Sequence, residues 1–166
     1  LRDPRLQAAE LYVTHAYGPR PGPFPTHVIN ARHLAQITET RAPQGIAALV
    51  PILPPAAPRA GERAICLHQI QDPGNLGSML RSGAAAGATL AVLSKGCHDP
   101  WSPKALRGGQ GAQFVLPLLS GVDIVEWLAG FEGESLALAL AEDHGLYARS
   151  LSGSLALIVG NEGAGL

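Results

Sequence analysis

The chain has 166 residues, of which 46% are hydrophobic and 15% charged, and its formal net charge is −1 at pH 7. Its size and apolar content allow a substantial core, built as one domain or as two small ones. The near-neutral charge excludes a strong global positive field, so any contact with nucleic acid must come from a local basic surface.

Residues 1–58 form the first predicted domain, a small α/β unit. Short apolar runs predict strands at 11–14, 27–29 and 46–50, with a helix over 31–37 between the last two. The segment 51–61 carries four prolines within eight residues. Such a run can continue neither a helix nor a central strand, which predicts a semi-rigid linker.

Residues 59–166 form the second predicted domain, in which strands and helices alternate. Strands are predicted at 64–70, 89–94, 114–118, 135–141 and 155–159, and helices near 76–87, 103–111, 122–130 and 145–150. The continuous apolar run 136–140 predicts a strand that is buried on both faces. That pattern is typical of a parallel sheet flanked by helices, so the predicted fold class is α/β.

The segment from Gln71 to Arg81 is the most informative part of the chain. It follows a predicted buried strand and opens a predicted helix, an arrangement that places chemistry at the carboxyl end of a parallel sheet. Within it, Pro73 fixes one backbone dihedral, and we expect Gly74 and Gly77 to adopt backbone angles closed to other residues.

Three side chains of this segment are candidates for helix capping or for chemistry. Asn75 and Ser78 are both predicted helix caps. Arg81 is then expected in the first turns of the helix, near the turn. It is either a functional cation or an ordinary arginine on the surface of a helix.

Two further segments carry candidate binding residues. The loop 160–165 has its glycines in the order G-x-x-G-x-G, which is a poor match to the dinucleotide pattern G-x-G-x-x-G, and the chain has no P-loop. Lys104 and Arg107 lie three residues apart on a predicted helix and therefore share a face. They either bind anionic groups such as phosphates or form an ordinary solvated surface.

Cysteine and histidine spacing argues against metal or disulfide chemistry. Cys66 and Cys97 are far apart, and Cys66 lies in a predicted buried strand, where it is expected to fill the core. The six histidines form neither a His-Glu-x-x-His motif nor a Cys/His cluster, so no metal site is predicted. No run of about 18 strongly apolar residues is present, and the predicted location is the cytoplasm.

Three segments together resemble the SpoU/TrmH class of the SPOUT superfamily of RNA 2′-O-ribose methyltransferases. Residues 72–81 are similar to the first signature motif of that family, 102–112 to its intervening Lys/Arg/Gly-Ala segment, and 157–166 to its second motif. They occur in the family's order and at roughly its spacing. Residues 1–58 resemble most of the family's small RNA-binding domain, and 59–166 most of its methyltransferase domain.

The resemblance implies S-adenosylmethionine-dependent methylation of a ribose 2′-hydroxyl in rRNA or tRNA by a homodimer. It also implies a deep trefoil knot at the carboxyl end of the sheet. The family's third motif and closing helix are expected beyond Leu166, so the knot would be incomplete in this chain. The residues implied are, for catalysis, Arg81, Asn75 and Glu162; for the cofactor, Gly160, Asn161, Glu162 and Gly163; and for RNA, Lys104, Arg107 and Arg41.

The role of Arg81 is limited by its chemistry. A guanidinium has a pKa above about 12, so it is a poor base near neutrality. We predict that it binds phosphate and positions the hydroxyl, while the RNA phosphate or water assists removal of the proton. Two alternatives to the enzyme remain open: a non-catalytic RNA-binding protein that keeps the fold, and, more distantly, a nucleotide-binding oxidoreductase.

Overall fold

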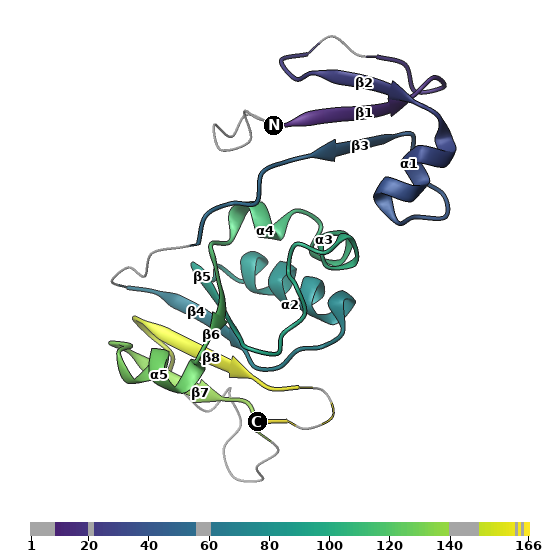
Figure 1. Ribbon diagram of the computed structural model, residues 1–166. Coiled ribbons are helices and arrows are strands. Elements are labelled where there is room, and N and C mark those ends of the chain that lie inside the picture. The colour runs from purple at the N-terminus through teal and green to yellow at the C-terminus, as the bar shows by residue number, and fades with distance from the viewer. Residues whose placement is uncertain (1–8, 20–21, 56–60, 140–149, 162, 164) are drawn as a thin grey trace. The chain divides into compact units, whose positions relative to one another are not determined.

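The computed structural model describes residues 9–19, 22–55, 61–139, 150–161, 163 and 165–166. The chain divides into two compact units, Leu1–Leu53 and Pro54–Leu166, and the boundary falls inside the proline-rich segment 51–61. Each unit is built around its own sheet (Figure 1).

The first unit is a three-stranded sheet with one helix. Its elements are β1 (Glu10–Thr14), β2 (Thr26–Ile29), α1 (Ala31–Thr38) and β3 (Ile46–Leu49). Strand order is β2-β1-β3, with β2 parallel and β3 antiparallel to β1. Asn30 caps α1 by accepting a 2.8 Å hydrogen bond from the His33 N–H, and Leu34 of the helix is fully buried. These elements match the strands and the helix predicted for this part of the chain.

The second unit contains the predicted parallel sheet. Its strands are β4 (Arg63–Leu67), β5 (Leu90–Ser94), β6 (Leu118–Val122), β7 (Glu134–Ala137) and β8 (Leu155–Val159). They are all parallel, in the order β6-β5-β4-β8-β7. The chain builds outward from β4 through β5 to β6, and then returns to the other side of β4. The two directions diverge at β4 and β8, and a ligand of an open α/β sheet binds at the carboxyl ends of such a switch point.

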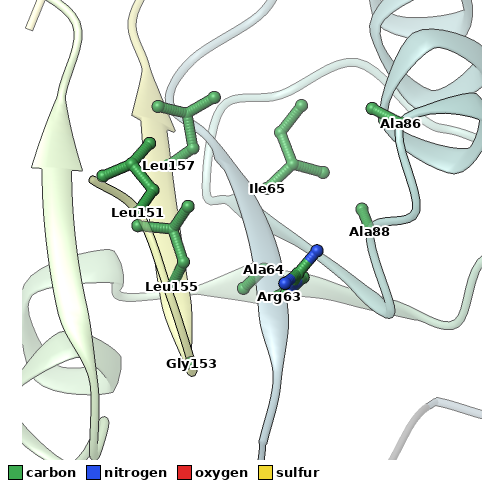
Figure 2. Close-up of a pocket in the computed structure, with 10 residues that line it drawn as sticks. Arg63, Ala64, Ile65, Ala86, Ala88, Leu151, Gly153, Leu155 and Leu157 are labelled. Atoms are coloured by element: carbon green, nitrogen blue, oxygen red, sulfur yellow. The ribbon is translucent and has the colours of Figure 1, made fainter. Parts of the chain in front are cut away.

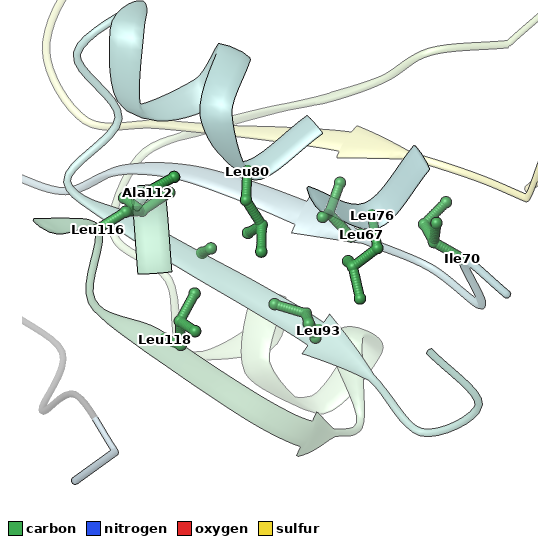
Figure 3. Close-up of a cluster of buried hydrophobic side chains, with 9 residues drawn as sticks. Leu67, Ile70, Leu76, Leu80, Leu93, Ala112, Leu116 and Leu118 are labelled. Atoms are coloured by element: carbon green, nitrogen blue, oxygen red, sulfur yellow. The ribbon is translucent and has the colours of Figure 1, made fainter. Parts of the chain in front are cut away.

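Helices cover both faces of this sheet. They are α2 (Pro73–Ala85), α3 (Pro103–Gly109), α4 (Ala112–Val115) and α5 (Ile124–Ala129). On one face, α2 and α4 pack on the sheet through a buried cluster shown in Figure 3: Leu67, Ile70, Leu76, Leu80, Ala91, Leu93, Ala112, Leu116 and Leu118. On the other face, α5 packs through Ile124 against the alternate strand residues. Cys66 lies in that second core, fully buried, and burial raises the pKa of its thiol to about 12, as expected of a core residue.

The predicted strand at 114–118 is wrong. Residues Ala112–Val115 form the short helix α4, and β6 begins only at Leu118, after Pro117. Ala112 and Leu116, four residues apart, both reach the core, so this apolar run has the period of a helical turn. Pro117 has no N–H, but its carbonyl accepts the Ala91 N–H at 2.9 Å and so leads the chain into the sheet.

The burial predicted for residues 136–140 is also wrong over the part that the structure describes, 136–139, although Leu136 and Ala137 do pair in parallel with β8. Strand β7 lies at the edge of the sheet; Leu136 is only half-buried, and Leu138, just beyond it, is 45% exposed. The strand buried along its whole length is β5. Apolar composition therefore indicated a strand without indicating its place in the sheet. Residues 145–149 of the predicted helix near 145–150 lie outside the described residues, and Ser150 lies in neither a helix nor a strand.

Candidate active site

The candidate site lies at the carboxyl ends of β4 and β8, where two loops leave the sheet side by side. The loop after β4 leads into α2, and the glycine-rich loop follows β8. The two predicted motif segments are therefore brought together by the pairing of their strands.

The loop after β4 turns at Gln69, which has a left-handed backbone with φ of 53°. Its N–H donates to the Ser94 Oγ at 2.9 Å, which anchors the turn to the end of β5. This turn also ends the strand at Leu67, before the predicted limit at residue 70. A non-glycine residue in this conformation is uncommon and must be held by its surroundings.

Helix α2 begins earlier than predicted, and its cap is Asp72. The Asp72 carboxylate accepts the Asn75 N–H at 2.8 Å, and Pro73 occupies the start of the helix. Asn75 therefore lies inside the first turn, and neither it nor Ser78 is the cap. Arg81 is the ninth residue of α2 counted from Pro73, so it lies in the third turn, not close to the start. An acid directly before a proline is a helix-start signal that could have identified this cap.

The glycines of the first motif serve helix packing. Gly74 and Gly77 have ordinary helical backbones, so the predicted unusual angles are absent. A Cβ on Gly77 would instead collide with the Ala105 carbonyl and lie 2.6 Å from the Gly109 nitrogen, both in the backbone of α3. The two helices thus touch backbone to backbone. Arg81 continues the stripe that Gly74 and Gly77 begin, so it projects from the α3 side of α2 and is exposed.

An ion pair joins the start of α2 to α3. The Lys104 Nζ donates to the Asp72 carboxylate at 2.9 Å, with side-chain exposures of 58% for the lysine and 45% for the aspartate. The hydrogen bond from Lys104, followed by that from the Asn75 N–H, lowers the pKa of Asp72 below its ordinary value. Asp72 thereby brings together Asn75, a predicted catalytic residue, and Lys104, a predicted RNA ligand.

The remaining predicted basic residues lie on open surfaces. Arg107 is exposed on α3, and its carbonyl accepts the Gln110 side chain at 2.7 Å. Arg41 is exposed in the first unit, in the segment between α1 and β3.

The glycine-rich loop after β8 closes on itself. Asn161 and Gly165 form an antiparallel bridge, with backbone hydrogen bonds of 3.1 and 2.9 Å. Gly165 has a φ of 69°, and a Cβ on Gly160 would collide with the Gly165 carbonyl. Among the described residues, a Cβ on Gly163 would meet only the Asn161 Oδ1, at 3.5 Å. Gly160 and Gly165 are thus required by the loop itself, whereas Gly163 is not.

The side chain of Asn161 links this loop to the loop after β4. Its Nδ2 donates to the Gln69 carbonyl at 2.7 Å, and its Oδ1 accepts the Gly163 N–H at 2.8 Å. Glu162, predicted to contribute to catalysis and cofactor binding, lies outside the described residues.

A hollow of about 520 Å³ opens at the carboxyl edge of the sheet, and sequence reasoning did not predict its walls. It is lined by His68, Gln69, Ser94, Lys95, Val122, Asp123, Ile124, Val125, Leu128, Ala137, Ile158 and Leu166. Its size falls within the range of about 300–1,000 Å³ that is usual for small-molecule sites. Ile158 and Leu166 flank the glycine-rich loop in sequence.

A second hollow, of about 210 Å³, lies beside the last turn of α2 near the start of β4 (Figure 2). Its lining is apolar apart from Arg63, and it contains none of the predicted site residues. Among the residues that the structure describes, no group of three or more His, Cys, Asp or Glu side chains could hold a metal ion. No helix in the same part of the chain has the length and apolar character needed to span a membrane.

Comparisons with known proteins place the chain among methyltransferases. It is 33% identical over 143 residues to the 23S rRNA (guanosine(2553)-2′-O)-methyltransferase RlmP of Bacillus subtilis. The matched region covers 84% of this chain and 57% of RlmP. It is 41% identical over 86 residues to human mitochondrial rRNA methyltransferase 3. The matched region covers 52% of this chain and 20% of that protein. The chain thus spans little more than half of RlmP and a fifth of the human protein.

Solved structures show the same fold. The AdoMet-bound rRNA methyltransferase from Sinorhizobium meliloti superimposes with a TM-score of 0.77 at 26% identity, over 96% of this chain and 66% of that one. AviRb, a SpoU methyltransferase from Streptomyces viridochromogenes, superimposes with a TM-score of 0.78 at 20% identity, over 95% of this chain and 67% of that one. The model of the SpoU rRNA Methylase family matches residues 62–166, which include both loops of the candidate site. The chain belongs to the SpoU rRNA methylase family.

Proposed function

We propose that the protein transfers a methyl group from S-adenosylmethionine to a ribose 2′-hydroxyl of rRNA or tRNA. The observation that carries this proposal is the union of the two motif loops at the switch point of the sheet, in a chain of the SpoU family. RlmP, whose name specifies 2′-O-methylation of rRNA, supports the choice of the ribose hydroxyl.

The cofactor is proposed to bind at the carboxyl edge, against the glycine-rich loop and the larger hollow beside it. The hollow is mainly apolar, as a site for an adenosine ring system requires, and small residues at Gly160 and Gly163 let the loop backbone approach a ligand. Asn161 and Glu162 belong to the same proposed cofactor loop. When bound, the cofactor supplies an electrophilic methyl group.

Arg81 is proposed to bind the RNA phosphate and orient the 2′-hydroxyl. Its side chain is exposed on α2 and is therefore accessible to a substrate. The 2′-oxygen gains the methyl group and loses its proton to the RNA phosphate or to water, because a guanidinium is a poor base near neutrality. Asn75, in the first turn of the same helix, and Glu162 are proposed to assist this positioning.

Residues 1–58 are proposed to be an RNA-binding domain that contacts RNA through Arg41. Residues 59–166 are proposed to be the methyltransferase domain, which contacts RNA through Lys104 and Arg107. The Asp72–Lys104 pair is largely exposed, and such pairs are weak, so a phosphate can compete for the lysine. Binding should weaken as salt rises, and replacing both Lys104 and Arg107 with alanine should make that dependence shallower. An unchanged slope would return the two residues to an ordinary solvated surface.

The trefoil knot and the homodimer are proposed on family membership, and the cytoplasmic location is proposed on the likeness to the bacterial enzyme RlmP. The likeness of the fold to the SpoU methyltransferase AviRb supports the knot. Sedimentation equilibrium of the full-length protein would test the dimer, and a monomer at micromolar concentration would contradict it.

The test of the activity uses labelled S-adenosylmethionine and undermethylated total RNA. A 2′-O-methyl group blocks alkaline cleavage, so the label should remain in alkali-resistant dinucleotides. Arg81→Ala should abolish transfer, and Arg81→Lys should also fail, because a point ammonium cannot reproduce the planar fork of arginine. Label in alkali-labile mononucleotides would indicate base methylation. RNA binding without transfer would favour the non-catalytic alternative.

A further inference from the structure

The hydrogen bonds of Asn161 define the orientation of its carboxamide. A backbone carbonyl, that of Gln69, lies 2.7 Å from one end, and a backbone N–H, that of Gly163, lies 2.8 Å from the other. The carbonyl requires a donor and the N–H requires an acceptor, so only one orientation satisfies both. The side chain therefore spans two loops whose bonded residues, Gln69 and Asn161, are 92 positions apart in sequence.

Gln69 is held from both sides. Its N–H is bonded to Ser94 at the end of β5, and its carbonyl to Asn161 after β8, while its φ is 53°. A residue in this region of backbone space persists where surrounding contacts fix it. Three residues later, Asp72 caps α2, the helix that carries Asn75 and Arg81. The position of Gln69 therefore sets where the helix starts relative to the glycine-rich loop.

We propose that Asn161 is a positioning residue that keeps the first turn of α2 in register with the glycine-rich loop. This inference rests on the proposed function, because these two elements are the proposed RNA-facing and cofactor-facing parts of the site. It departs from the expectation that the Asn161 side chain binds the cofactor, since both ends of the carboxamide bond the protein backbone. Loss of the link should misalign the reacting groups more than it weakens the binding of either substrate.

The variants Asn161→Asp and Asn161→Ala separate the two bonds. Aspartate is nearly isosteric with asparagine, so it avoids the cavity that alanine leaves, and it retains an acceptor for the Gly163 N–H. It places an oxygen against the Gln69 carbonyl, where a donor is needed. Both variants should lower kcat by roughly ten- to a hundredfold, the range expected from misplacing reacting groups by about 1 Å. KM for cofactor and for RNA should change by less than about threefold.

The control is Thr89→Val, at the opposite end of the sheet. It keeps the side-chain shape and removes the Thr89 Oγ1 bonds to the Arg63 N–H, at 2.9 Å, and to Glu62, at 2.7 Å. It should lower thermal stability while leaving kcat near that of the wild type. An equal fall of kcat in Thr89→Val and Asn161→Asp, at matched loss of stability, would overturn the proposal. So would wild-type kcat in Asn161→Asp, or a raised cofactor KM at normal kcat.

Amide hydrogen exchange tests the link between Asn161 and Gln69 directly, without a measurement of enzyme activity. In Asn161→Asp, peptides covering residues 68–75 should exchange roughly three- to tenfold faster, the factor expected from one lost hydrogen bond. Thr89→Val should leave these peptides unchanged. Unchanged exchange in Asn161→Asp would overturn the link even if turnover fell. A wild-type protein that transfers no methyl group would instead refute the proposed function, with the exchange result still deciding the link.

Discussion

Replacing Gly77 with alanine distinguishes packing from backbone conformation as the reason for this glycine. Gly77 has an ordinary helical backbone, so helix propensity alone would make alanine more stable by about 1 kcal/mol. The new methyl group, however, would lie 2.6 Å from the Gly109 nitrogen and 2.9 Å from the Gly108 carbonyl carbon. These are backbone atoms of α3, which cannot rotate away as a side chain does, so the helices must separate.

The magnitude follows from these opposing effects. Overpacking costs roughly 1–3 kcal/mol, and a backbone obstacle favours the upper part of that range. After the propensity gain, Gly77→Ala should destabilise the protein by about 2 kcal/mol. At about 2–4 °C per kcal/mol for a chain of this size, the melting temperature should fall by roughly 4–8 °C.

The assay is thermal and urea unfolding, with Gly83→Ala as the matched control in the same helix. A Cβ on Gly83 would meet the Ile65 Cγ2 at 3.2 Å, and a side-chain atom can move by the few tenths of an ångström required. Gly83→Ala should therefore be close to neutral, because the propensity gain offsets the contact. A Gly77→Ala variant as stable as the wild type, or more so, would refute the close approach of α2 and α3.

Three further expectations follow from the same structure. Gly160→Ala should destabilise the protein, because its Cβ meets the Gly165 carbonyl. Gly163→Ala should keep the stability of the protein and weaken cofactor binding. Thermal melts would measure the stability of both variants, and calorimetric titration would measure their affinity for the cofactor. Asp72→Ala should lower the melting temperature more than Asp72→Asn, which keeps the cap. Because the pKa of Asp72 is lowered in the folded state, the stability that its carboxylate contributes is present at neutral pH and is lost as the pH falls through that lowered value. In Asp72→Asn, the melting temperature should therefore fall less steeply with acid than in the wild type. Cys66, with a thiol pKa of about 12, should resist alkylation at mildly alkaline pH until the protein unfolds, and equal labelling of native and urea-treated protein by mass spectrometry would contradict its burial.

The parallel sheet and its order of elements were predictable because they depend on local patterns. Runs of branched apolar residues alternate with helical segments, and such alternation has few solutions other than a parallel sheet between helices. The positions of the candidate residues at strand ends follow from the same alternation. A strand at 114–118 was predicted wrongly because a short apolar run fits a helical turn and a strand equally well.

What local patterns could not determine is which distant segments touch. The glycines at 74 and 77 suggested backbone freedom, but their role depends on α3 crossing α2 at that point. The degree to which β7 is buried depends on its place at the edge of the sheet, and no residue within the strand specifies that place.

The two polar links of the site have the same origin. The Asp72–Lys104 pair joins residues 32 positions apart, and the Asn161–Gln69 bond joins residues 92 apart. By itself, the sequence determined most of the strands and helices and the chemistry available near their ends, but not α4 or the start of α2. Only the tertiary structure decided how those ends are joined, because pairing β4 with β8 brings together loops that are independent along the chain.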